Sequence, residues 1–412
     1  MPLKKKQNLI YFILSLSLFV SLYFQENSSG GSKLDNILTK HFIDYFQISL
    51  SEGLNYFIKT EQVHSPVFYI VVAKTKLLFG NHLSSIIYVI ISATLPFLFY
   101  NLLKKKFIHA NKEYLFFLSL LIFLSPYFRS SASWFTNDNL AIILFCLSLK
   151  YFLKIKNNKD STTKNFFLCF IFLSLAAYIR QYYGIFIVIY IIELIKKKNL
   201  TLIINCILLN LVLSLPLLYY SYYLYIENKL YFHSSNPIDV NIIDNIIFVF
   251  SIIFIYLFPF IISIKLNFQN IKNYISKNIK LILLVSIIVL FIIFCHSFRS
   301  LEYGGGAIYK LTRNFTSYQN FAFGFIFGIT SLFLLTLFEK KFINYVVIFL
   351  LCSISFDFVF QKYYDPLILI TFLLLIESKK LTNLINGKMF KINIVYLFFL
   401  LFLFGTNIYY YN

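Results

Sequence analysis

The sequence predicts an all-α fold, a polytopic bundle of about 13 transmembrane helices. Of its 412 residues, 59% are hydrophobic and only 13% are charged, whereas soluble domains have roughly 25% charged residues. Apolar runs of roughly 17–25 residues recur along the chain, and each is long enough to cross a bilayer as a helix. Lysine clusters separate these runs. The three observations favour lipid over water as the surroundings of the chain.

The expected spans follow one another along the whole chain. They lie at residues 8–24, 85–103, 113–127, 136–153, 165–179, 182–195, 200–222, 243–264, 281–297, 319–338, 342–360, 366–377 and 392–410. The first run follows three lysines, as in a secretory signal peptide, but no small-residue cleavage site comes after it. We therefore interpret it as an uncleaved first transmembrane helix.

The positive charges predict the topology. The net charge is +20, but the lysines sit in short loops between apolar runs, which is the pattern that orients membrane proteins and not one of nucleic-acid binding. With the N-terminus in the cytoplasm, alternating spans put about two thirds of the 37 Lys and Arg residues on the cytoplasmic side. The cytoplasmic clusters lie at 4–6, 104–106, 154–164, 196–198, 265–280, 340–341 and 379–391. One span more or fewer would break this pattern, so we expect an odd number of spans and an outer C-terminus.

The outer face carries the groups suited to chemistry. All the arginines then lie on the non-cytoplasmic side, which is periplasmic, extracellular or lumenal, and Arg suits bidentate recognition of anions. No stretch outside the apolar runs is long enough for a separate domain, so residues 1–412 are expected to form one membrane-embedded unit. Its longest polar stretch is the first outer loop, residues 25–84. Apolar side chains over 42–57 predict an interfacial amphipathic helix, and 66–80 a second one.

Asp44 in this loop is the candidate for catalysis. The interfacial helix would hold its carboxylate just above the bilayer, where it could deprotonate a hydroxyl as a general base. The alternative is an ordinary solvated Asp on the polar face of such a helix.

A second group of candidates interrupts the apolar runs. Ionisable groups at such depth usually face a cavity, so Arg180 with Gln181 beside it would suit a phosphate, unless it is a snorkelling arginine in a hairpin. Asn137 and Asp138 open the fourth span from outside. They would bind sugar hydroxyls or orient Arg129, unless they only cap the helix.

Two late outer segments add basic and aromatic groups. Residues 298–318, with Arg313, are expected to form either a mobile lid over an anionic substrate or a flexible connector. Lys362 and Tyr364 come just before Asp365-Pro366, a pair that also suits a helix start. No metal site is predicted, because no two of the 6 histidines have metal-ligand spacing on one helix.

Several short motifs follow one another in a defined order along the chain. After the first span and the loop with Asp44 come His64-Ser65-Pro66-Val67-Phe68-Tyr69, Leu78-Phe79-Gly80, Ser125-Pro126-Tyr127-Phe128, Asn137-Asp138-Asn139 and Lys362-Tyr363-Tyr364-Asp365-Pro366. This order resembles the GT-C superfamily of membrane glycosyltransferases. The stretches at 43–48 and 180–182 are similar to motifs of the dolichyl-phosphate-glucose α-1,2-glucosyltransferases. The chain departs from that family at Tyr45, where a second acid is usual, and at Ser65, where a second Pro is usual.

The resemblance implies transfer of a sugar from a polyprenyl-phosphate carrier to a glycan or lipid-linked acceptor at the outer face. It implies Asp44 as the general base of an inverting displacement, and Arg180, with Arg313 or Lys362, as ligands of the leaving phosphate. The remaining candidates for substrate binding are His64, Asn137, Asp138, Gln181 and Tyr364. The polyprenyl-phosphate sugar would be a donor substrate, and use of a divalent metal is left open.

Two other classes of protein fit an outer-facing, multi-pass chain. A lipid-linked sugar transporter or flippase should show internal repeats and ionisable groups at the midplane, whereas here no repeat is seen and the polar groups gather on one face. A glycan polymerase or ligase would also work outside. Its catalytic loops normally come late in the chain, so the long first loop favours the transferase.

Overall fold

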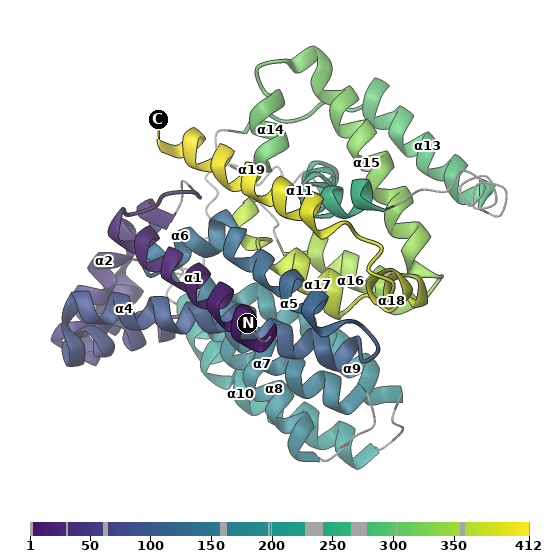
Figure 1. Ribbon diagram of the computed structural model, residues 1–412. Coiled ribbons are helices and arrows are strands. Elements are labelled where there is room, and N and C mark those ends of the chain that lie inside the picture. The colour runs from purple at the N-terminus through teal and green to yellow at the C-terminus, as the bar shows by residue number, and fades with distance from the viewer. Residues whose placement is uncertain are drawn as a thin grey trace. The chain divides into compact units, whose positions relative to one another are not determined.

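Helices make up all the regular secondary structure in the part of the chain described by the computed structural model (Figure 1). That part comprises residues 3–29, 32–60, 65–156, 163–196, 198, 200–226, 242–264, 278–301, 304–354 and 359–411. A helix pairs each backbone N–H with a carbonyl of its own segment, which an apolar environment requires. The predicted all-α fold is therefore confirmed.

Six of the described helices are long and apolar enough to cross a membrane. They are α1 (Leu3–Tyr23), α4 (Val67–Lys106), α10 (Leu200–Ile226), α11 (Ile242–Ser263), α15 (Thr316–Phe338) and α19 (Ile392–Tyr411). Every apolar run predicted as a span contains a helix, but the count of thirteen spans is not confirmed. The reason is length: α9 (Ile187–Lys196) has 10 residues and rises only about 15 Å, half of a hydrocarbon core.

By its internal contacts the chain divides into two compact units. The first unit comprises residues 1–106, 115–236 and 400–412, and the second comprises 107–114 and 237–399. The single membrane-embedded unit expected from the sequence stays a prediction.

In the first unit, helices pack both on sequence neighbours and on helices further along the chain. There α7 (Asp138–Lys156) and α8 (Thr163–Ile179) lie side by side, and α10 packs on α8 (Figure 1). The buried Ser148 hydroxyl donates to the Cys169 carbonyl oxygen (2.6 Å) and lies 2.9 Å from the Tyr190 hydroxyl. It thereby joins α7, α8 and α9 through polar groups that would otherwise be unsatisfied.

The segment predicted to be the first outer loop contains two helices, α2 (Ser32–Ile48) and α3 (Leu50–Lys59). The Ser49 hydroxyl accepts the Glu52 N–H (3.0 Å) and caps α3. Phe42 of α2 packs against Phe57 and Tyr69, with ring centroids 5.4 and 5.5 Å away. These aromatic contacts seat the loop helices on the start of α4. A separate stripe of α2 leaves Leu34, Ile37 and Leu38 exposed, as expected of a helix at a membrane surface.

A single glycine breaks α4. Gly80 has φ 73° and ψ 171°, a conformation open to essentially no other residue, and it joins two helices across a kink. The break falls between the predicted interfacial helix at 66–80 and the predicted span at 85–103. Side chains before and after the kink at Gly80 can therefore face the same region of the protein.

A second bend follows the short connection after α4. Helix α5 (Lys112–Leu120) continues into the 3-10 turn η1 (Leu121–Leu124), and α6 (Pro126–Trp134) leaves at 59°. The Ser125 hydroxyl accepts the Phe128 N–H (3.1 Å), and Pro126 takes the first helical position, where a missing N–H costs nothing. The pair satisfies the criteria for one broken span or a re-entrant loop.

The lysines near the ends of α4 and α7 gather at one end of the first unit. Lys104, Lys105 and Lys150 line a cavity of about 390 Å³. Lys154 lies near enough to act electrostatically on Lys105. The charge pattern of the sequence predicts that these lysines share one side of the membrane.

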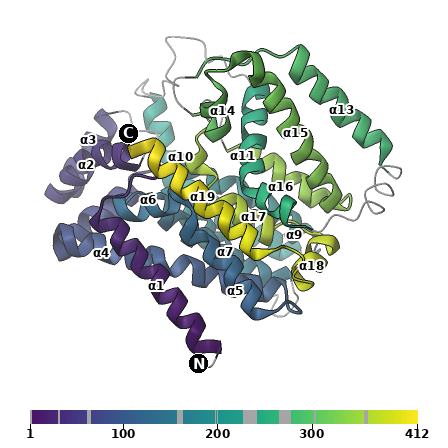
Figure 2. The ribbon, with the colours of Figure 1, turned by 45° about the horizontal axis from the view of Figure 1, so that its top comes forward.

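In the second unit, α11 is the central helix. It packs against α14 (Gly306–Thr312), α15, α16 (Phe342–Cys352) and α17 (Leu367–Leu374), while α13 (Ile279–Phe294) lies beside α15 (Figure 2). The Phe248 ring of α11 lies 5.3–5.6 Å from the rings of Phe298, Tyr309 and Phe323. The described part of this unit also contains η3 (Gln361–Tyr363) and α18 (Lys379–Asn386).

The break at Gly80 yields the first prediction. A Cβ at Gly80 or at Gly405 would meet nothing within 4 Å, but only Gly80 has a positive φ. Gly80→Ala should therefore lower the free energy of unfolding by about 1–3 kcal/mol through backbone strain alone. Thermal unfolding in detergent, followed by the fluorescence of the single tryptophan, measures this. Gly405→Ala is the matched control, and equal stability of the two variants would contradict the strain.

Candidate functional site

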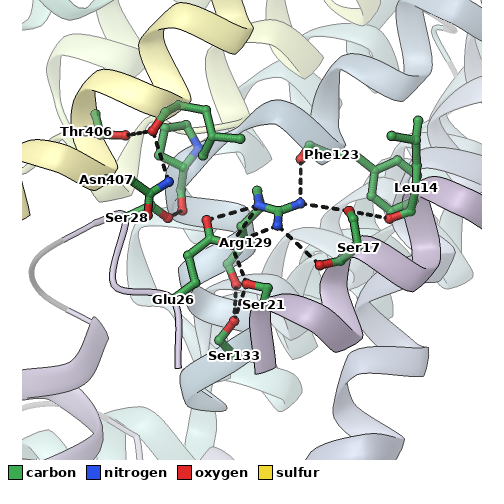
Figure 3. Close-up of polar contacts among 12 residues, drawn as sticks. Leu14, Ser17, Ser21, Glu26, Ser28, Phe123, Arg129, Ser133, Thr406 and Asn407 are labelled. Atoms are coloured by element: carbon green, nitrogen blue, oxygen red, sulfur yellow. Dashed lines mark hydrogen bonds and ion pairs between the residues drawn. The ribbon is translucent and has the colours of Figure 1, made fainter. Parts of the chain in front are cut away.

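Arg129 and Glu26 form an ion pair at the start of the first outer loop (Figure 3). The Arg129 Nε lies 3.0 Å from both Glu26 carboxylate oxygens, and Nη2 lies 2.8 Å from Oε2. The other guanidinium N–H groups donate to the Ser17 hydroxyl (2.9 Å) and main-chain oxygen (3.2 Å), and to the Phe123 carbonyl (3.4 Å). This arginine ties α1 and the loop to α6, so its role is structural.

The surroundings of Glu26 set its charge state. Burial favours the neutral acid, but the hydrogen bonds and charge of Arg129, helped by Ser21 and Ser28, outweigh burial and lower the pKa of Glu26 below its ordinary value. The Glu26 main-chain oxygen also accepts the Trp134 indole N–H (2.9 Å). A charged, hydrogen-bonded Glu26 thus fixes the end of α6.

A second ion pair joins the predicted binding residues Arg180 and Asp138. Arg180 Nη2 lies 2.9 Å from Asp138 Oδ1, and the two side chains are only 10% and 15% exposed. Asp138 begins α7, and Arg180 precedes η2 (Gln181–Phe186), so two helix ends meet here. The Thr136 hydroxyl lies 3.3 Å from Asp138 Oδ2. The structure therefore brings together two residues that the sequence suggested separately.

Tyr69 and Asp35 belong to the same neighbourhood. Arg180, Asp35 and Asp138 all lie near enough to act electrostatically on the buried Tyr69 hydroxyl. Asp35 is half-buried, whereas Asp44 is exposed. The two are nine positions apart on α2, and at about 100° per residue they point to opposite faces of the helix. Sequence reasoning missed Asp35, although this spacing, and Phe42 seven positions after it, could have identified its face.

Asp44 lies on the other side of α2. Among the described charged groups, it acts electrostatically on Lys76 of α4. Arg180 instead pairs with Asp138. Its role as general base stays a prediction.

An apolar groove lies beside Arg180. It occupies about 380 Å³ between α8, η2, α9 and α10, and its lining is mostly aliphatic and aromatic, with Ser174, Gln181, Asn210 and Ser214 among its polar members. Outside the groove lining, α10 exposes Leu208, Leu215 and Leu218. An apolar chain could therefore lie in the groove with a polar head close to Gln181.

The remaining predicted residues are dispersed. Asn137 is buried, and its carbonyl accepts the Ala141 N–H (3.2 Å), so its backbone helps to start α7. His64 lies outside the described residues. Arg313 is exposed at the end of α14, Lys362 lies 5.4 Å from the Phe360 ring, and Tyr364 is fully buried. These three belong to the second unit, and their approach to Arg180 stays a prediction.

The second unit contains a polar cluster that sequence reasoning missed. His296 Nε2 lies 2.6 Å from Oδ1 of Asp244, whose side chain is fully buried, and the Arg299 main-chain N–H donates to Asp244 Oδ2 (3.1 Å). Arg299 Nη2 donates to the Asn245 side chain (2.6 Å). The feature of the sequence that could have indicated this cluster was Asp244, an acid in the first turn of a strongly apolar helix. The cluster anchors the predicted lid segment to α11.

The glycines of that segment have packing roles. A Cβ at Gly306 would lie 2.9 Å from the Ile252 side chain, and one at Gly304 would lie 3.1 Å from the Val359 carbonyl oxygen. Both have positive φ. Close backbone approach explains these glycines, and the lid stays a prediction.

No group of three or more His, Cys, Asp or Glu side chains in the described residues is arranged to hold a metal ion. The groups that do converge are a guanidinium, carboxylates, a phenol and an apolar groove. This set suits an anionic headgroup carried on an apolar tail. Searches for similar proteins found no matching family model, no matching curated protein and no matching solved structure.

The Arg129–Glu26 pair yields the second prediction. Glu26→Gln should lower the free energy of unfolding near neutral pH by about 3 kcal/mol, since it leaves a largely buried arginine uncompensated. Because the folded-state pKa of Glu26 lies below its ordinary 4.5, its stabilisation is present above about pH 4.5 and disappears as the pH falls through the folded-state value. The difference between wild type and variant should therefore shrink in acid.

Denaturant unfolding in detergent between about pH 3 and pH 7 measures this difference. Lys196→Met is the control, because it breaks the Lys196–Glu193 pair, whose lysine is 52% exposed, and should cost less than about 1 kcal/mol. A Glu26→Gln effect that does not depend on pH would contradict the assigned charge state.

Proposed function

We propose that this chain is an integral membrane glycosyltransferase. It moves a sugar from a polyprenyl-phosphate carrier to a glycan or lipid-linked acceptor on the non-cytoplasmic face. The observation that carries the proposal is the largely buried Arg180–Asp138 pair next to an apolar groove. The proposed topology has thirteen spans, an inner N-terminus and an outer C-terminus.

The arginine binds the carrier phosphate. A guanidinium offers five N–H donors in one plane, which suit the oxygens of a phosphate monoester or diester. Asp138 contacts one Nη of Arg180 at 2.9 Å and so orients that plane. In surroundings with little water, this charge strongly stabilises the phosphate as it gains negative charge in the transition state.

The groove between α8 and α10 holds the start of the polyprenyl chain. Its lining is mainly apolar, so burial of isoprene units from water in it is favourable. Gln181 lines the groove and follows Arg180 directly. The phosphate of one carrier therefore binds Arg180 while its isoprene chain lies in the groove. A soluble sugar nucleotide would leave the groove unused.

Asp44 supplies the base in the proposed reaction. The acceptor oxygen attacks the anomeric carbon, its proton passes to the Asp44 carboxylate, and the bond from that carbon to the phosphate oxygen breaks. Polyprenyl phosphate leaves with the electron pair, and the configuration inverts. The acceptor must then reach the exposed face of α2. Arg313, Lys362, Tyr364 and His64 are proposed to complete substrate binding.

A transporter of lipid-linked sugars would use the same arginine and groove without forming a bond. A polymerase or ligase would transfer a whole glycan block. Formation of a labelled product separates a transferase from a transporter, and the size and linkage of that product separate a transferase of single sugars from a polymerase or ligase.

The catalytic assignment yields the third prediction. In membrane vesicles supplied with polyprenyl-phosphate hexoses and pentoses labelled in the sugar, Asp44→Asn should lower the transfer rate by at least about 100-fold, since the general base is lost. Asp35→Asn is the matched control, because it changes the same residue type on the opposite face of α2. Lost activity in Asp35→Asn with full activity in Asp44→Asn would move the base to Asp35, and no transfer from any donor would contradict the proposed function.

The groove yields the fourth prediction. Ser214→Trp should fill the groove and raise the KM for a polyprenyl-phosphate donor by about tenfold or more, because the lipid loses apolar contact. The KM for a donor with a short, one-isoprene tail should change much less. Leu215→Trp, one position along on the exposed side of α10, is the control. Equal effects of the two variants on KM would rule out the groove as the lipid site.

A further inference from the structure

We infer that a second, cationic cavity in the first unit binds the phosphate ester of a sugar or polyol. The cavity has a volume of about 690 Å³ and lies between the end of α1, α2, the two halves of α4 and the end of α6. It contains none of the residues of the Arg180 neighbourhood or of the apolar groove. The inference does not depend on the proposed function, because it concerns binding alone.

The charged groups of this cavity favour an anion. Lys40 and Lys76 line it together with His82, and the two ammonium groups lie near enough to repel each other. Asp44 is the acid that acts on Lys76, so one carboxylate is set against two ammonium groups. A phosphate between the two lysines would relieve the repulsion and gain charge-assisted hydrogen bonds.

The wall of the cavity is preformed by the network around Glu26. Trp134 lines the cavity, its indole N–H donates to the Glu26 main-chain oxygen (2.9 Å), and its own carbonyl accepts the Asn36 side-chain amide. Ser133, also in the lining, donates to the Arg129 carbonyl (3.1 Å) (Figure 3). Lys33 Nζ lies 5.9 Å from the centre of the Trp134 ring. The site therefore needs little ordering to bind a ligand.

The break at Gly80 builds the opposite wall. Lys76 precedes the break, while Asn81, His82 and Ser85 follow it, and all four face the cavity. In a straight helix, Lys76 and Ser85 would point to opposite sides, because nine residues make two and a half turns. The strained glycine thus gathers an ammonium group and hydrogen-bonding groups at one place.

The mixture of groups specifies the chemistry of the ligand. Ammonium groups suit a phosphate, amide and hydroxyl groups suit sugar or polyol hydroxyls, and the Trp134 and Tyr23 rings offer apolar faces for ring C–H groups. Such a phosphate ester exists both as a soluble sugar phosphate and as a phospholipid headgroup. The cavity fits the chemistry that the two share.

The test measures binding to the full chain in phosphatidylcholine nanodiscs. The single tryptophan lies in the cavity, so its fluorescence should respond to titration with glucose 1-phosphate, or to phosphatidylinositol included in the discs. Lys40→Gln combined with Lys76→Gln should weaken binding at least about tenfold. Lys59→Gln combined with Lys74→Gln removes the same charge from exposed lysines of the same outer segment and should change the affinity less than about twofold.

Each outcome decides the inference. A response to glucose 1-phosphate that depends on Lys40 and Lys76 supports a soluble ligand, and such a response to phosphatidylinositol alone supports a lipid headgroup. No response to either probe, or equal losses in the two double variants, would overturn the inference. Thermal unfolding of each variant confirms that it is folded. Because no sugar transfer is measured, an inactive transferase would leave this result unchanged.

Discussion

The first unit depends on one buried ion pair. Arg129 uses its guanidinium N–H groups on Glu26, Ser17 and Phe123, and so links the end of α1 to the bend before α6. Removing charges from water is costly unless they are paired and hydrogen-bonded, so both partners and their neighbours must stay in place together. The position of Trp134, and with it the wall of the cationic cavity, follows from this requirement.

The first unit contains two different candidate binding sites. On one side, Arg180 and Asp138 meet next to an apolar groove; on the other, Lys40 and Lys76 face a polar cavity lined by an indole ring. Helix α2 contributes to both: Asp35 acts on Tyr69 beside Arg180, and Asp44 acts on Lys76 of the second cavity. One amphipathic helix can serve both because its residues repeat every 3.6 positions. An enzyme that joins a lipid-linked donor to a polar acceptor needs such a division.

Helices and their order could be predicted from the sequence, because the length and composition of each apolar run are local properties. The number of spans could not. In the run at 342–360 the described helix α16 ends at Cys352, and in the run at 182–195 the 3-10 helix η2 passes into α9 at Ile187. Composition alone does not show where such a helix stops. Arg180 and Asp138 were each identified, since charged groups stand out in apolar stretches, but their pairing spans 42 positions and needs the fold. Asp244 and His296 were missed for the same reason.

The cavity lined by Lys104, Lys105 and Lys150 limits how often the chain can cross a bilayer between α4 and the end of α7. It puts the C-terminal ends of α4 and α7 at one end of the unit. Between those ends the chain passes through the bent pair α5–α6 and then along α7. To return to its starting side it must cross an even number of times, so the bent pair must traverse the membrane if α7 does. If the chain instead turned back at Ser125-Pro126 as a hairpin, every later helix would have the opposite orientation in the membrane. An accessibility label placed beside Trp134 shows on which side of the membrane the end of α6 lies, and so whether the bent pair crosses.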